Sequence, residues 1–516
     1  VDYKQTEFYL YKKKTPPHIK LIGVSKTPDF TFSLLDKIEV EANRRTELMN
    51  RFEAQNLEEY RKHKDEPGYV NIPRLFIVID EFHEMSQFVS TEMEYKDKLE
   101  NILREYRAQG ITCLMADQTF STGLSGLTSA AKNQIGLRIA MRNEASPQEI
   151  KDTLEVDRAL YSDSMQRTIA IMSQGEFIMK VYVRNSRGEL TDIKLEKFKG
   201  LLTKGDDIAP ISKALRSLYK GQYQKGLLYV NTKEQVSWDD AEPMALDALE
   251  PLRYPNIRMY LGRSATLRPC FGLDMGRQPD ENLAIVGGTA YQRWELLASI
   301  MRSCKFRNYK LLVFMAEFSD LMSDFAPDIR RTCQEIPGAE LMETLEEWCA
   351  KLDSLEKLID ERRNTEDIVC VFIGLEIANV ELSRLPDKGG NRSGGSRSFL
   401  DTISKYATPV AGTESIVEPI PVETSEAFNA TSIIDKLFSS GARNGIRCIT
   451  EVSVYRQFSR ILKIKDMCRH KVAFSMSADD CLMYLGNSNF QKSIGQNAVY
   501  GDGGKEVKKL LPYKLQ

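Results

Sequence analysis

The chain has 516 residues, of which 42% are hydrophobic and 28% charged, and its formal net charge is −2. The length predicts two to four domains, and the near-neutral charge excludes a global basic field for nucleic acid, although a local basic surface stays compatible with it. No apolar run approaches the roughly 18 residues of a membrane span. With no visible export signal, the nine cysteines, which include no C-x-x-C pair, predict reduced thiols in the cytoplasm and no structural zinc site.

The first region covers residues 1–200 and opens on "VDYK", which is typical of a strand end. We expect an upstream segment to be missing, because the sequence begins abruptly in strand-like residues. Residues 30–54 place apolar side chains at helical spacing and predict a long amphipathic helix. Residues 75–79 form an apolar run without alternation, which is typical of a central parallel strand covered on both faces.

Two adjacent carboxylates, Asp80 and Glu81, directly follow the apolar run. Acidic residues are costly to bury unpaired, and open α/β sheets bind their ligands at the carboxyl ends of parallel strands. A carboxylate there can hold Mg²⁺ through water, and its neighbour can polarise an attacking water. An acidic turn without catalysis explains this stretch equally well. His83 is the only histidine near these acids, and we expect it to be a surface or supporting residue.

Further elements continue the pattern of the first region. Residues 92–110 predict a second amphipathic helix closed by Gly110, and residues 111–118 predict a buried strand that ends in Asp117 and Gln118. Residues 134–142 predict another strand, and 146–154 a helix. The alternation of strands and helices predicts a parallel sheet with helices on both faces.

The alternation of strands and helices stops over residues 201–255, which we interpret as a connecting segment with short helices. The alternation resumes in a second region, residues 256–516. There, residues 281–303 predict a strand, a Gly-Gly turn and a helix, and 308–316 and 367–376 predict further strands. The Gly/Ser/Arg-rich stretch 387–399 predicts a flexible insertion.

An ordered internal repeat links the two regions. The sequence Gly-Ile-Thr-Cys begins at Gly110, and Gly-Ile-Arg-Cys begins at Gly445. Residues 138–146 and 471–479 are again similar, at about the same distance from those glycines. The repeat predicts two homologous α/β domains, of which the second has diverged.

A phosphate-binding loop of the form G-x-x-x-x-G-K-[ST] does not occur in residues 1–516. In the second region, Gly287 and Gly288 follow the strand 283–286 and could turn their N–H groups toward an anion. The expected lysine and hydroxyl are absent there, and Arg293 stands nearby instead. After the strand in 367–376, Gly374 stands where the first region has the acidic pair Asp80 and Glu81. We predict a non-hydrolysing domain in which these glycines serve only a strand–turn–helix.

The first region resembles the motor domain of the FtsK/SpoIIIE group of P-loop ATPases, in the FtsK–HerA superfamily. The matching motifs are "VDYK" (1–4), "PPH" (16–18), "EANRRTELM" (41–49), "NLEEYRKH" (56–63), "LFIVIDEF" (75–82), "YRAQGITCLMADQ" (106–118) and "LRIAMRNEAS" (137–146). Their order and spacing over about 150 residues carry the likeness, and the second region looks like a degenerate copy. The tandem ATPase domains of type VII secretion systems are also similar.

The resemblance implies an α/β fold class with two tandem RecA-like P-loop NTPase domains, the first without its Walker A part in this chain and the second degenerate. It implies ATP and Mg²⁺ as cofactors. Asp80 would hold Mg²⁺ through water, Glu81 would activate water, and Gln118 would sense the γ-phosphate. Such motors form rings, commonly hexamers, in which a neighbouring subunit supplies an arginine. Arg138 and Arg142 are the first candidates, followed by Arg104 and Arg107.

Three functions stay open at this point. The first is an ATP-driven translocase of double-stranded DNA, and the second is a protein-translocating ATPase of the type VII secretion kind. The third is a non-enzymatic scaffold, which the missing phosphate loop favours. The resemblance also leaves open a membrane association through regions outside this chain, and partners in secretion or defence complexes.

Overall fold

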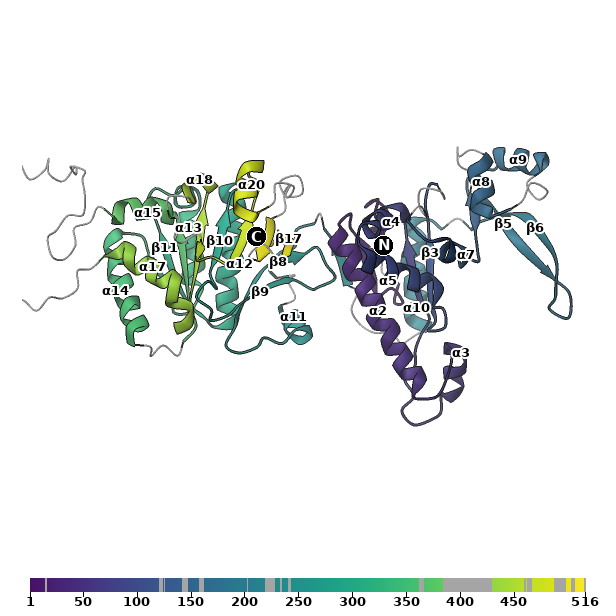
Figure 1. Cartoon of the computed structure of the whole chain (residues 1–516), viewed down its shortest axis with the longest axis horizontal. Coiled ribbons are helices and arrows are strands. Elements are labelled where there is room, and N and C mark those ends of the chain that lie inside the picture. The colour runs from purple at the N-terminus through teal and green to yellow at the C-terminus, as the bar shows by residue number, and fades with distance from the viewer. Residues whose placement is uncertain are drawn as a thin grey trace, which may run out of the picture. The chain divides into compact units, whose positions relative to one another are not determined.

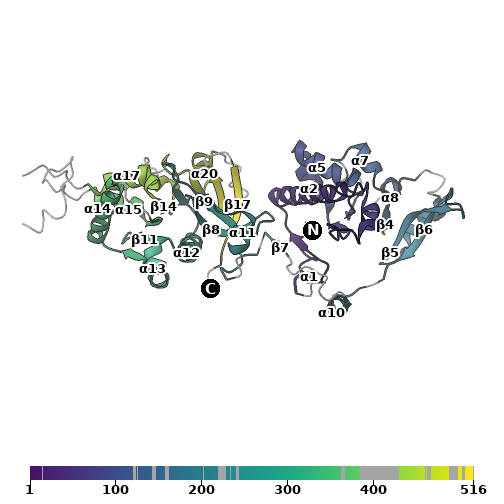
Figure 2. The ribbon, with the colours of Figure 1, turned by 90° about the horizontal axis from the view of Figure 1, so that it is seen from below.

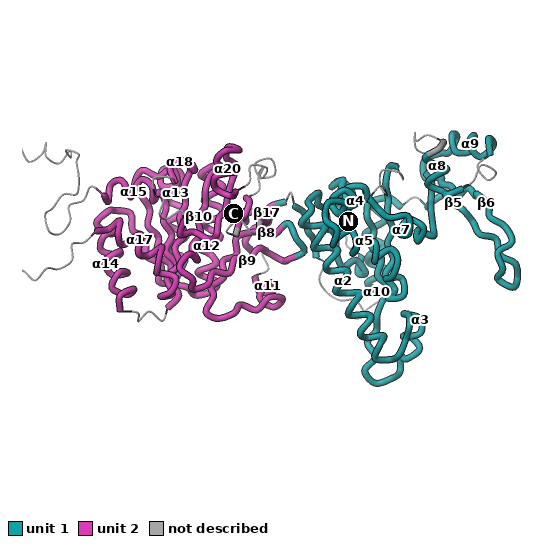
Figure 3. The backbone as a smooth tube through the Cα atoms, in the orientation of Figure 1, with its two compact units in different colours: residues 1–234, 265–267 teal, residues 235–264, 268–516 magenta. Residues whose placement is uncertain are grey.

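The described part of the chain divides into two compact units. The structure is a computed structural model. It describes residues 1–516 except 14–15, 120–123, 125, 142–146, 157–161, 202, 219–227, 233, 240–242, 362–365, 384–428, 459–460, 462–465, 487–497, 503–505 and 515–516. The predicted insertion 387–399 and the candidate Arg142 therefore lie outside the described residues. Unit 1 comprises residues 1–234 and 265–267, and unit 2 comprises 235–264 and 268–516 (Figure 3).

Unit 1 is built around short parallel strands. β2 (Leu75–Ile79) and β3 (Ile111–Met115) pair in parallel, as do β1 (Leu21–Val24) and β7 (Leu228–Asn231). Asp2 makes parallel bridges with both Val24 and Asp80, so the start of the chain lies between β1 and β2. β7 comes from the stretch interpreted as a connecting segment, in which sequence periodicity gave no strand.

Three helices cover one face of β2 and β3: α2 (Pro28–Asn50), α4 (Phe82–Ser90) and α5 (Met93–Arg104) (Figure 1). Side chains alternate across a strand, so Ile77 and Ile79 join this core while Phe76 and Val78 point the other way. Phe76 is 64% and Val78 41% exposed. The prediction that this strand is covered on both faces is therefore wrong within the described residues.

The rest of unit 1 departs from a parallel sheet. β4 (Ile139–Met141) pairs antiparallel with β5 (Glu176–Arg184), which forms a hairpin with β6 (Leu190–Lys199). The prediction that the strand in 134–142 continues the parallel sheet is wrong, because the hairpin offers it an antiparallel partner. The other α-helices in the described part of this unit are α1 (Leu10–Lys13), α3 (Leu57–Tyr60), α7 (Ser129–Asn133), α8 (Pro147–Leu154), α9 (Asp163–Ala170) and α10 (Ile208–Leu218).

Unit 2 contains a ten-stranded sheet. Six neighbouring strands are parallel, in the order β12 (Glu340–Met342), β11 (Lys310–Met315), β13 (Ile368–Ile373), β14 (Ile446–Val452), β10 (Leu283–Val286) and β15 (His470–Ala473). The sheet continues in antiparallel fashion through β16 (Ala498–Asp502), β17 (Glu506–Pro512), β8 (Ile257–Ser264) and β9 (Phe271–Met275).

Helices cover both faces of the parallel part of this sheet (Figures 1 and 2). α12 (Ala290–Arg307) and α13 (Asp320–Gln334) pack on one face, and α14 (Leu345–Glu361), α15 (Leu375–Leu382) and α17 (Ala430–Ser440) on the other. Every residue of β13 is consequently buried, as a central parallel strand requires. Smaller helices among the described residues of this unit are α11 (Pro243–Leu249), α18 (Tyr455–Phe458) and α20 (Ala478–Leu485).

One pair of neighbouring parallel strands in each unit has the same register. Leu75 pairs with Ile111 at the start of β2 and β3, and Ile368 pairs with Ile446 at the start of β13 and β14. The glycine before β3 and the glycine before β14 both have positive φ angles, +74° and +82°. Counting from the paired residues, Glu81 corresponds to Gly374. Among the described residues, no helix is both long and apolar enough to cross a bilayer.

Candidate active site in unit 1

The backbone of Glu81 is strained at the point where β2 ends and α4 begins. Its φ of 54° and ψ of 56° lie in the left-handed region, where a residue other than glycine costs on the order of 1 kcal/mol. At the corresponding position of unit 2, Gly374 adopts a similar conformation, with φ 68° and ψ 35°. A strained carboxylate at a strand end, where glycine would fit without strain, indicates a functional constraint.

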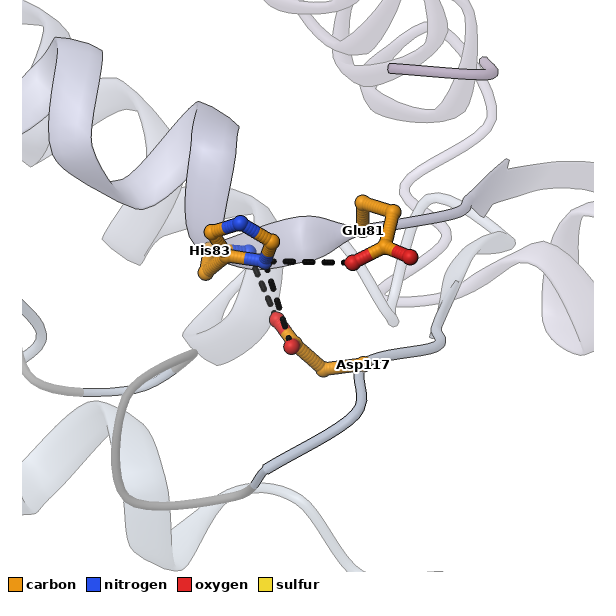
Figure 4. A group of neighbouring side chains, drawn as sticks. All are labelled: Glu81, His83 and Asp117. Atoms are coloured by element: carbon orange, nitrogen blue, oxygen red, sulfur yellow. Dashed lines mark hydrogen bonds and ion pairs between the residues drawn. The ribbon is translucent and has the colours of Figure 1, made fainter. Parts of the chain in front are cut away.

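The Glu81 side chain is buried and only half satisfied. Its Oε1 accepts a hydrogen bond of 2.8 Å from Gln118 Nε2, so the structure brings two of the predicted site residues together. Its Oε2 is buried, and no hydrogen-bond donor reaches it among the described residues. The imidazole Nδ1 of His83 lies 3.4 Å from this oxygen (Figure 4). A buried acceptor without a donor is rare in folded proteins and is suited to a water or a cation.

Asp117 connects the end of β3 to the first turn of α4. Its Oδ2 accepts a 2.6 Å hydrogen bond from the backbone N–H of His83, and its Oδ1 accepts one of 2.8 Å from the backbone N–H of Gln118. Asp117 Oδ1 also lies 3.2 Å from His83 Nδ1. These contacts fix the orientation of the two strand ends, so Gln118 remains beside Glu81.

Asp80 occupies the strand end next to Glu81. Burial raises the pKa of its carboxyl group above the ordinary value, and the nearby charges of Glu81 and Asp2 act in the same direction. A bound cation would favour the ionised form of such a carboxylate. The oxygen donors of Asp80 and Glu81 match the preference of Mg²⁺ for hard oxygen ligands, so these residues fit the implied metal.

Asp2 is a buried carboxylate that backbone groups hold in its charged form. Its two oxygens accept hydrogen bonds from the N–H groups of four consecutive residues, Gln5, Thr6, Glu7 and Phe8. Burial acts to raise the pKa of Asp2, but these four donors outweigh burial and lower it. The loop that follows the chain start is thereby fixed beside Asp80.

The candidate arginines occupy different environments in unit 1. Arg138 is largely buried and donates to the carbonyl oxygens of Lys132 and Ile135, at 3.0 and 3.3 Å. Arg104 ends α5 and is exposed, and Arg107 in the following turn is also exposed. The role of an arginine finger stays a prediction for each of these residues.

The N–H groups of the glycine turn in unit 2 donate to main-chain carbonyl oxygens. The N–H of Gly287 donates to the carbonyl of Val452 at 3.1 Å, and that of Gly288 to the carbonyl of Ser475 at 3.0 Å. Both glycines have positive φ, +88° and +69°, and a Cβ on Gly288 would lie 2.5 Å from the Cβ of Phe474. Of the two interpretations of this turn, the structure therefore favours structural glycines.

A buried arginine closes this turn in unit 2. Arg293 Nη1 donates to the carbonyl oxygens of Gly287 and Gly288, at 3.1 and 2.9 Å. The same guanidinium pairs with the carboxylates of Glu451 and Asp320. Burial raises the pKa of Glu451 to about 8, while Arg293 acts in the opposite direction. A protein side chain thus supplies the positive charge at this loop.

Comparison with known proteins finds similar solved structures but no similar sequence family. No family model and no curated protein matches the sequence. The cytoplasmic domain of the type VII secretion ATPase EccC from Thermomonospora curvata matches with a TM-score of 0.57 and 14% identity, over 99% of this chain and 56% of that one. ATPases 2 and 3 of EssC from Geobacillus thermodenitrificans match with a TM-score of 0.53 and 13% identity, over 100% of this chain and 84% of that one.

This chain has the fold of tandem ATPase domains. ATPases 2 and 3 of Thermomonospora curvata EccC in complex with a signal sequence peptide match as well, with a TM-score of 0.50 and 12% identity over 100% of this chain and 81% of that one. The predicted fold class and the predicted likeness to this group of P-loop ATPases are confirmed at the level of the fold. At these identities the likeness concerns the fold alone, and this chain spans little more than half of the first matched structure.

Sequence reasoning missed two clusters around these sites. It assigned no contact between Glu81, His83 and Asp117, because the register that joins residues 83 and 117 depends on the pairing of two strands far apart in sequence. It also missed the contact of Arg293 with Glu451. A charged residue within the apolar run of β14 was a signal that a buried partner is required.

Proposed function

We propose that unit 1 carries the hydrolytic residues of an ATP-driven translocase. The observation that supports this most is the buried Glu81 carboxylate, which has one oxygen on Gln118 and the other without a hydrogen-bond donor among the described residues. It lies at the carboxyl ends of two adjacent parallel strands, where open α/β sheets bind their ligands. A strained, half-satisfied acid at such an edge is suited to proton transfer.

Each of the three site residues has a separate task in this proposal. Asp80 holds the hydrated metal at the strand end. Glu81 Oε2 accepts the proton of the attacking water, while Gln118 holds Oε1 and so fixes the direction of the free oxygen. Mg²⁺, when bound, neutralises charge on the phosphate oxygens. Because Gln118 follows β3, a displacement of that strand would move Glu81, which would couple hydrolysis to movement.

In this proposal, residues that are not in this sequence supply the phosphate-binding group. In unit 2, β10 and its glycine turn lie beside β14, on the side away from β13. No strand among the described residues pairs with the corresponding side of β3 in unit 1. The proposal places a phosphate-binding strand there. An arginine from a neighbouring subunit in a ring, with Arg138, Arg142, Arg104 and Arg107 as candidates, would complete the site.

Duplex DNA is the cargo that the sequence favours, and a protein substrate is the second candidate. The fold neighbours favour the second candidate, since EccC is a type VII secretion ATPase and one of its structures holds a signal sequence peptide. Unit 2 would bind or regulate without hydrolysis, because Arg293 fills its glycine turn.

Phosphate release by the full-length protein tests this proposal. We expect Mg²⁺-dependent turnover that Glu81→Gln abolishes, measured with and without duplex DNA. Stimulation by DNA supports a DNA translocase, and turnover indifferent to DNA supports a protein cargo. If the full-length protein neither binds nor hydrolyses ATP, the proposal is wrong and the chain is a scaffold.

A further inference from the structure

Two carboxylates and one imidazole converge at the edge of the candidate active site. Glu81 comes from the end of β2, His83 from the first turn of α4 and Asp117 from the end of β3 (Figure 4). One ligand atom from each of them lies within 4.8 Å of the others. Neither magnesium binding by Asp80 nor proton transfer by Glu81 requires the imidazole at this place.

The distances between the donor atoms suit a small metal ion. His83 Nδ1 lies 3.4 Å from Glu81 Oε2 and 3.2 Å from Asp117 Oδ1. In a tetrahedral site with bonds of about 2.0–2.2 Å, neighbouring ligand atoms are about 3.3–3.6 Å apart. The two distances from His83 are thus close to those of a tetrahedral site, and the pair Glu81 and Asp117 lies within 4.8 Å.

A second, independent observation points to a ligand. Glu81 is 8% exposed, and its Oε2 has no hydrogen-bond donor among the described residues, although it points toward the imidazole. The other Glu81 oxygen is held by Gln118, and backbone N–H groups hold both oxygens of Asp117. The oriented carboxylates leave one buried acceptor unsatisfied, which a metal ion would satisfy.

The nitrogen ligand identifies the class of ion. Mg²⁺ and Ca²⁺ prefer oxygen ligands, whereas imidazole is a common ligand of zinc and other first-row transition metals. The His83 side chain is 31% exposed, which gives an ion access from solvent. Its Nε2 lies 3.7 Å from Glu84 Oε1, close to a carboxylate of the kind that orients metal-bound histidines.

We propose that Glu81, His83 and Asp117 form a binding site for a first-row transition-metal ion such as Zn²⁺. Three protein ligands leave a fourth position for water. The consequence rests on the proposed function: an ion held here takes up the Glu81 oxygen that would accept a proton, so it would hold unit 1 inactive. Unit 2 offers no such set, because Gly374, Glu376 and Val452 occupy the corresponding positions.

Calorimetric titration of the full-length protein with Zn²⁺, in excess Mg²⁺ and without nucleotide, tests the site independently of ATP hydrolysis. His83→Gln and Asp117→Asn should each weaken binding at least about tenfold, because each removes one of three ligands. His63→Gln is the matched control, since His63 pairs with Glu66 and lies outside the cluster. This control should bind Zn²⁺ as the wild type does.

Thermal unfolding supplies a second measurement that does not depend on heats of binding. Zn²⁺ should raise the Tm of the wild type and of His63→Gln, and should raise that of His83→Gln less. The proposal is overturned if wild type and His83→Gln bind Zn²⁺ with equal affinity, or if excess Mg²⁺ abolishes binding. A protein without ATPase activity that still shows the His83-dependent binding would overturn the proposed function and leave the metal site intact.

Discussion

The strand pairs β2–β3 and β13–β14 share a register but differ in what surrounds their carboxyl ends. In unit 1 the left-handed position after the strand carries Glu81, whereas in unit 2 it carries Gly374. Unit 2 covers β13 on both faces and fills its glycine turn with Arg293. Unit 1 leaves Phe76 and Val78 exposed and a buried oxygen of Glu81 without a donor among the described residues. In unit 2 the guanidinium of Arg293 therefore occupies the glycine turn. In unit 1 the backbone of Glu81 is strained, and one of its carboxylate oxygens has no hydrogen-bond donor among the described residues.

The largest expected effect concerns the acid that distinguishes the two units. Glu81→Gln should lower ATP turnover by at least about 100-fold, because the amide cannot accept the proton of the attacking water. Its free energy of unfolding should change little, since the shape of the side chain is kept. Phosphate release measures the first quantity, and denaturant unfolding the second. The matched control is Glu92→Gln, an exposed residue before α5 whose side chain makes no cap hydrogen bond; turnover equal in both variants would contradict the role of Glu81.

The second test concerns the arginine that closes unit 2. Arg293→Met should lower the free energy of unfolding of unit 2 by about 3–5 kcal/mol, because it leaves the buried carboxyl group of Glu451 without its partner. Arg331→Met removes only an exposed pair with Asp328 and should cost less than about 1 kcal/mol. Denaturant unfolding compares the two variants. Equal stability of both would show that the buried network does not hold the glycine turn.

The features that could be predicted from the sequence are those set by residues close together in the chain, and the features that could not depend on contacts between distant residues. The strand 75–79 and the Asp80–Glu81 end were predictable from local apolar runs and their polar breaks, and the tandem fold followed from the ordered motifs. The antiparallel partner of β4 and the exposure of Phe76 were not predictable, because they depend on which distant elements cover a strand. The contact of Glu81 with Gln118 required the β2–β3 pairing, and that of Arg293 with Glu451 required the fold of unit 2.

A third test substitutes the residue with left-handed backbone angles in each unit. Gly374→Ala should lower the free energy of unfolding of unit 2 by about 1–3 kcal/mol, because the backbone disfavours a side chain there. The added Cβ would also lie 2.8 Å from the Cβ of Ser319. Glu81→Gly should leave unit 1 as stable or more stable, since it relieves the same strain. Denaturant unfolding of both variants checks the sign, and a destabilised Glu81→Gly would contradict the strain at that residue.

The smallest expected effect concerns pH. The pKa of Asp2 is lowered in the folded protein by its four backbone donors, so its contribution to stability is present above the unfolded pKa of about 4 and is lost as the pH falls through the folded pKa. Asp2→Asn should cost about 1 kcal/mol at neutral pH. Unfolding of wild type and variant at neutral and at acidic pH should show the gap shrinking on acidification. A gap independent of pH would mean that the charge of Asp2 is not what stabilises the loop.

The most direct test of the difference between the units is a structure of the full-length Glu81→Gln protein with Mg²⁺ and a non-hydrolysable ATP analogue. We predict the triphosphate beside Asp80, Gln118 and the replaced acid, with Arg293 still bonded to the Gly287–Gly288 turn in unit 2. A triphosphate on that turn, with Arg293 displaced, or an edge of β2 and β3 filled only by protein side chains, would contradict the account.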